Sequence, residues 1–144
     1  MGEYFGCMRV LFLLTLLFLC SCGSRSLEDY RREGQESARS LTTQLRTIQS
    51  RQDLVNSAPK IKAGFNRLVD VMIAAQDFYQ SHPESVIPEL TEEDREYSQE
   101  LRFEINRILR IEGTEKLMTN YREEAHHRLH LFQTRLEEKK IKFH

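Results

Sequence analysis

The chain has 144 residues, with 21 Lys+Arg against 22 Asp+Glu and a formal net charge of -1. This length sets a limit of one domain, and the lack of a basic excess makes nucleic acid a poor candidate partner. The averages combine two unlike pieces, because residues 10–19 read VLFLLTLLFL without a charge, whereas the chain after residue 24 is densely charged. The sequence therefore predicts an N-terminal targeting segment followed by a separate folded part.

The apolar run near the N-terminus is typical of a secretory signal peptide. It is shorter than the roughly 20 residues that a membrane-spanning helix needs. Arg9 supplies the positive charge that should precede such a run. Glu3 does not suit the start of a signal, so translation begins at either Met1 or Met8. We expect residues 1–21 to be a cleaved signal peptide.

The apolar run ends with Leu19-Cys20-Ser21-Cys22, and residues 8–24 resemble the signal of bacterial lipoproteins. In that family, an aliphatic residue and two small residues precede a cysteine that receives a diacylglycerol. The new amino terminus then takes a further acyl chain such as palmitate. The resemblance implies that Cys22 is the lipid attachment site and the first mature residue. It also implies sorting to the outer membrane, on its periplasmic or outer surface. A plain secretory signal and an uncleaved anchor are the alternatives.

The mature part, residues 22–144, contains no cysteine after Cys22, since the chain's other two cysteines are Cys7 and Cys20. No disulfide can therefore staple the fold. Its 123 residues, counted as 144 less 21, are enough for one core. We expect a lipidated tether over residues 22–37 and a helical bundle over residues 38–144.

The mature part is expected to be all-α, an up-down bundle of three to four helices. Before Pro59, apolar or small residues recur at heptad spacing, which predicts one helix of about 30 residues. They are Leu27, Gly34, Leu41, Ile48 and Val55. Residues 25–37 have few apolar side chains and should be frayed. Pro59 is then expected to start a second helix over residues 60–80, because proline favours a first helical turn.

The second helix should stop before Pro83, because the residue before a proline is pushed out of the helical region. Thr91 should cap a third helix with an acidic first turn. Gly113 either ends this helix or interrupts one long rod of about 50 residues. The connection SHPESVIPEL carries two aliphatics, Val86 and Ile87, that are either packed in a loop or contact a partner.

Potential metal ligands gather only at Glu123, Glu124, His126, His127 and His130. A di-iron bundle needs a second Glu-x-x-His motif and further inward carboxylates, which the other segments do not supply. We therefore expect a solvated histidine face, with no metal site and no cofactor. The chain also has no phosphate-binding glycine loop, serine elbow or HExxH motif, so we expect no catalytic residues and no enzyme.

Two segments resemble the small helical pilotins of type III secretion systems, which guide outer-membrane pore subunits. They read FYQSHP over residues 78–83 and EAHHRL over residues 124–129. The resemblance implies a protein-binding function for the anchored bundle, with the partner's identity and the oligomeric state left open. One alternative is a spacer lipoprotein that oligomerises through its heptads. A less favoured one is a metal-binding helical protein.

Overall fold

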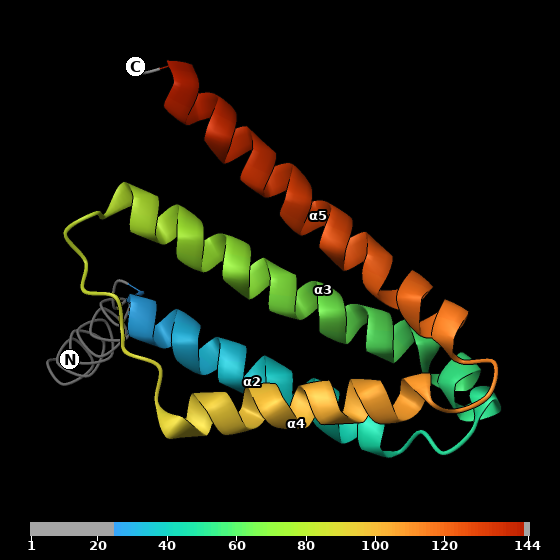
Figure 1. Ribbon diagram of the computed structural model, residues 1–144. Coiled ribbons are helices and arrows are strands. Elements are labelled where there is room, and N and C mark those ends of the chain that lie inside the picture. Colours follow the sequence, from blue (N-terminus) through green and yellow to red (C-terminus); the bar gives the residue numbers. More distant parts are fainter. Residues whose placement is uncertain (1–24, 143–144) are drawn as a thin grey trace, which may run out of the picture.

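The fold is described from a computed structural model, which describes residues 25–142 and the side chains of residues 25–138. This part of the chain forms four helices and no strand, which confirms the all-α prediction (Figure 1). The helices are α2 (Leu27–Arg46), α3 (Arg51–Ser81), α4 (Glu92–Leu109) and α5 (Glu115–Lys142). The predicted signal peptide and Cys22 lie outside the described residues, so neither prediction is tested.

Three of the helices begin with the same capping box. In each, a Ser or Thr side chain accepts a hydrogen bond from the backbone N–H of an Asp three residues later. That carboxylate accepts a bond back from the backbone of the capping residue. The pairs are Ser26 with Asp29, Ser50 with Asp53, and Thr91 with Asp94. These local signals set where α2, α3 and α4 start, and the prediction of Thr91 as a cap is confirmed.

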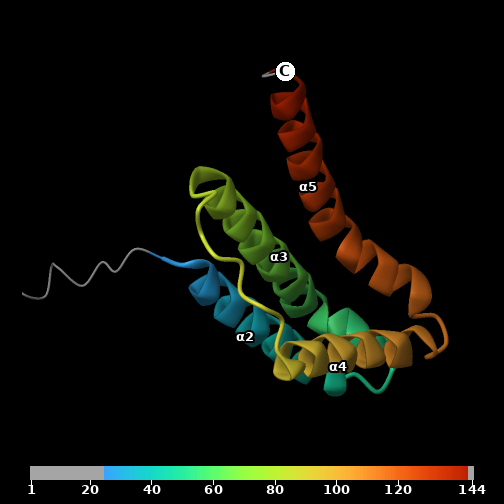
Figure 2. The ribbon, with the colours of Figure 1, turned by 60° about the vertical axis from the view of Figure 1, so that its left-hand side comes forward.

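The helices alternate in direction, with α2 and α4 parallel to each other and α3 and α5 opposed to them (Figure 1). Helix α2 lies beside both α3 and α4, and α5 lies along α3. Helices α4 and α5 meet mainly near their connection, and α5 diverges from the bundle toward its C-terminal end (Figure 2). The result is an up-down bundle that is tightly closed at one end and open at the other.

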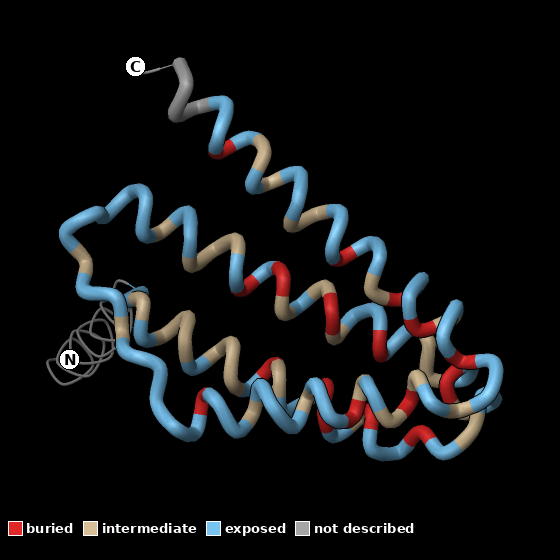
Figure 3. The backbone as a smooth tube through the Cα atoms, in the orientation of Figure 1, coloured by how far each residue is buried: buried red, intermediate tan, exposed pale blue. Residues whose placement is uncertain are grey.

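The closed end of the bundle holds the core. The fully buried large side chains all lie near the α2–α3 and α4–α5 connections, where buried positions concentrate (Figure 3). They are Leu41, Leu45, Ile48, Leu54, Ile61, Ile108 and Met118. Each contributes roughly 1.5–3 kcal/mol by leaving water. Leu41 and Ile48 of the predicted heptad line are buried in this core, whereas Val55 of the same line is exposed.

The parallel pair α2 and α4 is fastened at both ends by arginines. At the closed end, Arg107 of α4 donates to the carbonyl oxygens of Ile48, at 2.8 Å, and Leu45, at 2.9 Å. It thereby satisfies carbonyl groups that the end of α2 leaves without helical partners. At the open end, Arg31 of α2 donates to the Asp94 carboxylate of α4.

The predicted boundary at Pro59 is wrong. Helix α2 ends at Arg46, and α3 begins at Arg51 and runs straight through Pro59. The Ser50–Asp53 capping box starts the new helix, and the sequence reading overlooked this S-x-x-D pattern. Pro59 removes one backbone donor from the helix. Since Val55 and Pro59 are both exposed, water can reach the carbonyl that loses its partner. The end of this helix before Pro83 is as predicted.

The tether predicted over residues 22–37 is wrong for residues 27–37, which belong to α2. This stretch has few apolar residues, as noted, but its N-terminus is capped and Ser37 is buried. Arg31 and Gln35 both donate to Asp94, which holds this part of α2 against α4. Polar contacts with α4 thus stabilise the helix over residues 27–37, where the apolar pattern alone predicted a frayed helix.

The turn that contains Gly113 separates α4 from α5, so the alternative of one long rod does not hold. The Gly113 φ of +74° lies in the left-handed region that favours glycine, between the end of α4 at Leu109 and the start of α5 at Glu115. Thr114 stands just before α5, and its hydroxyl donates back to the carbonyls of Ile108 and Ile111. The turn thereby satisfies carbonyls at the end of α4.

Candidate docking groove

An apolar groove of about 440 Å³ opens at the thinly packed end of the bundle. Helices α2, α3 and α5 form its walls, and the 82–91 loop closes one side. The side chains that line it are mostly apolar, and they come from segments far apart in the sequence: Leu27, Tyr30, Val71, Met72, Ala75, Tyr79, Ile87, Pro88 and Leu129. Divergence of α5 from the bundle (Figure 2) leaves this surface without a covering helix.

Three large side chains of the groove remain in contact with water. Met72 is 52% exposed and Ile87 is 62% exposed, and Tyr79 is exposed as well. Scattered exposed aliphatics are common on soluble proteins, but these three converge on one concave surface. An apolar groove of this kind is a default candidate for binding.

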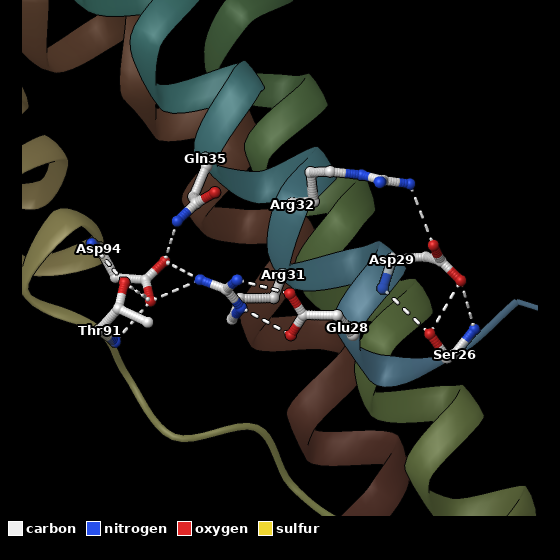
Figure 4. Close-up of polar contacts among 8 residues, drawn as sticks. All are labelled: Ser26, Glu28, Asp29, Arg31, Arg32, Gln35, Thr91 and Asp94. Carbon is white, nitrogen blue, oxygen red and sulfur yellow. Dashed lines mark hydrogen bonds and ion pairs between the residues drawn. The ribbon is translucent and has the colours of Figure 1, made fainter.

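The groove contains one ionised lining residue, Arg31, and its charge is fully engaged (Figure 4). The guanidinium donates to Glu28 at 2.8 Å and to Asp94 at 2.8 Å and 3.0 Å. Gln76 and Gln133 supply the neutral polar part of the lining. The apolar walls therefore carry no free charge that would oppose an apolar occupant.

The contacts of Asp94 fix the loop against the groove (Figure 4). Its carboxylate accepts hydrogen bonds from the Thr91 backbone N–H at 2.7 Å and hydroxyl at 2.9 Å, and from Gln35 at 2.6 Å. Thr91 ends the loop that carries Ile87 and Pro88, so the cluster ties the loop to α2. Burial would raise the pKa of the Asp94 carboxyl, but the bonds from Thr91, Arg31 and Gln35 outweigh it and lower the pKa to about 2.

The structure separates the two loop residues that the sequence singled out. Ile87 lines the groove, whereas Val86 does not and is 87% exposed. Whether either contacts a partner stays a prediction. The sequence reading missed Met72 and Leu129 as groove residues, because their spacing only marked them as apolar positions of their helices. The divergence of α5 leaves Met72 52% exposed and Leu129 partly buried, and no local pattern signals this divergence.

The histidines considered as metal ligands lie on the outside of α5. His126, His127 and His130 are exposed. Within the described part of the chain, no three His, Cys, Asp or Glu side chains come together in a way that could hold a metal ion. His82, at the end of α3, instead stacks on the Phe78 ring with the centroids 4.3 Å apart. This stack steadies the point at which the loop leaves α3.

None of the helices among residues 25–142 is both long and apolar enough to cross a bilayer. Comparison with protein-family models, curated proteins and solved structures finds no match to this chain.

Proposed function

We propose that the chain is a bacterial envelope lipoprotein, anchored by lipid on Cys22, whose bundle docks a helix of a partner protein in the apolar groove. The observation that carries this proposal is the convergence of exposed Met72, Tyr79 and Ile87 on one concave surface. Its one charged lining residue, Arg31, is paired with Glu28 and Asp94. A groove between helices accepts the apolar face of an amphipathic helix, whose side chains recur at intervals of three and four residues.

The backbone geometry favours a helical occupant over an extended one. Strand addition needs a sheet edge with unpaired backbone groups, and the described residues form helices whose backbone groups are bonded internally. Recognition would then depend on side chains. Burial of a few large apolar side chains on each partner is typical of the central contacts that dominate such interfaces.

The segments that resemble pilotins both reach the groove. Residues 78–83 form the end of α3 and the start of the loop, and they contribute Tyr79. Residues 124–129 lie on α5 and contribute Leu129. This coincidence supports a pilotin-like role, in which the anchored bundle accompanies a subunit of an envelope secretion or assembly system to the membrane.

The docking proposal is tested with two matched variants, Met72→Glu and Phe103→Glu. Both replace an exposed large apolar side chain with a carboxylate, but Phe103 lies on α4 and is not part of the groove. Tagged full-length variants are purified from membranes with their bound proteins. Met72→Glu should lose a secretion or assembly component that Phe103→Glu retains, because the carboxylate would have to be buried at the interface. Equal recovery in both variants contradicts the groove as the docking site.

The anchor is tested separately by metabolic labelling with a fatty acid. The wild-type chain should take up label, and Cys22→Ser should not, because the thiol that receives the lipid is removed. Label retained in Cys22→Ser would refute lipid attachment at this residue. It would leave the groove experiment unaffected, because that experiment reads partner recovery.

A further inference from the structure

The start of α2 lies beside the 82–91 loop, at the open end of the bundle (Figures 1 and 2). Leu27 and Tyr30 of α2 line the groove together with Ile87 and Pro88 of the loop. The segment that would be anchored by lipid therefore leaves the bundle at the end that carries the loop.

The anchor would sit close to this end, because α2 begins earlier than the sequence suggested. Leu27, the first residue of α2, lies only five positions after Cys22. A chain spans at most about 3.6 Å per residue, so this connection reaches no more than about 18 Å. A tether up to residue 37 would have allowed about three times that distance. The open end of the bundle is thus held within a short reach of the bilayer.

Two apolar side chains of the loop are not used by the groove or the core. Val86 is the most exposed large hydrophobic residue of the described part, and Leu90 is 67% exposed. Neither lines the groove. Glu84 and Glu89 are the acidic residues of the loop, and both are exposed. Their charge would repel anionic headgroups, so this surface suits a zwitterionic lipid surface.

We propose that Val86 and Leu90 form a second membrane contact, inserting into the zwitterionic headgroup region of the bilayer that holds Cys22. The inference rests on the proposed lipid anchor, because the short connection is what brings the loop to the surface. Apolar side chains buried at this boundary add to the hold of the lipid. The contact would also fix the bundle's orientation, with the groove opening beside the membrane where a membrane-bound partner passes.

The chain contains no tryptophan, so the fluorescence of a single introduced tryptophan reports the depth of that one side chain in the bilayer. Full-length Val86→Trp protein is purified in its membrane form and reconstituted into phosphatidylcholine vesicles that carry brominated acyl chains. Its emission should shift to shorter wavelength and lose intensity through quenching by bromine. Phe103→Trp, at an exposed site on α4, is the matched control and should keep the emission of a water-exposed ring. Adding Leu90→Asp to Val86→Trp should reduce the quenching, because a charge opposes insertion.

The same preparations are assayed for fatty acid on Cys22, which separates the two proposals. Quenching of Val86→Trp alone, on labelled protein, supports the contact. Labelled protein with no quenching of Val86→Trp overturns the loop contact and leaves the anchor standing. Equal quenching of Val86→Trp and Phe103→Trp also overturns it, because the loop would then be no closer to lipid than α4. Absence of label overturns the anchor, and the loop contact with it.

Discussion

Replacing the buried Asp94 by alanine should destabilise the bundle more than the same replacement at any other residue in the first turn of α4. The change removes the acceptor for the Thr91 backbone and hydroxyl, for Arg31, and for Gln35, at distances from 2.6 to 3.0 Å. It breaks the capping box of α4 and the polar link between α2 and α4 together. The open end of the bundle depends on that link, because the fully buried core lies at the other end.

The expected loss in free energy of unfolding is the sum of two contributions, one from the capping box and one from the polar link between α2 and α4. Losing one side of a capping box costs about 1 kcal/mol. Leaving the part-buried donors of Arg31 and Gln35 without their acceptor costs about a further 1–2 kcal/mol. The cost is not larger because Arg31 keeps its bond to Glu28. Together these give about 2–3 kcal/mol, or a fall in Tm of roughly 6–12 °C for a domain of this size.

Urea unfolding measured by circular dichroism gives the comparison. Glu92→Ala is the control, because Glu92 lies in the same first turn and pairs with Arg95 at 2.8 Å on the surface. An exposed pair of this kind contributes less than about 1 kcal/mol, so the control should stay close to wild type. If Asp94→Ala loses no more stability than Glu92→Ala, the reasoning about the buried cluster is refuted.

The same cluster predicts a dependence of stability on pH. The folded-state pKa of Asp94 is about 2, below its ordinary value of 3.8. A carboxyl with a lowered folded pKa stabilises the fold above its unfolded pKa, and the stabilisation is lost as pH falls through the folded pKa. The stability difference between wild type and Asp94→Asn should be constant above about pH 5 and shrink between about pH 4 and 2. A difference that is constant over this whole range would contradict the assignment.

Other substitutions test the fold. Pro59→Ala should raise the free energy of unfolding, measured in urea, by about 1–2 kcal/mol, because alanine restores the donor that the interior of α3 lacks; an unchanged free energy of unfolding would contradict this. Gly113→Ala should cost about 1–2 kcal/mol, since its φ is +74° and a Cβ would lie 3.0 Å from Arg51 Cδ; wild-type Tm would disprove strain there. Leu45→Ala should cost about 2–5 kcal/mol in calorimetry because Leu45 is fully buried, and a loss below about 1 kcal/mol would place the core elsewhere.

Local signals predicted much of the helix layout, and long-range contacts account for most of what they missed. Thr91 and Gly113 act within a few residues of their own positions, so their roles can be read directly. The break after Arg46 was missed although Ser50 and Asp53 form a readable box, because the heptad line continued through Ile48. The pairing of α2 with α4 joins residues about 60 positions apart, which no local pattern encodes.

The groove was predictable only in part. Ile87 could be recognised as an unusual aliphatic between two prolines, and the structure does place it at the groove. Met72 occupies an apolar position of α3, yet it is 52% exposed. The difference arises because the core gathers at the closed end, which leaves α3 partly uncovered where α5 diverges (Figure 3). Helix patterning identifies an apolar face without saying what covers it.

Photo-crosslinking in living cells tests the central claim most directly. A photoreactive amino acid is placed at Met72 in the groove, or at Phe103 on α4, in the full-length chain. Docking of a partner helix predicts that Met72 gives a crosslink to an envelope protein, mapped to an amphipathic helical segment, and that Phe103 does not. A crosslink pattern that is the same from both positions, or no intermolecular product from Met72, would contradict the docking function.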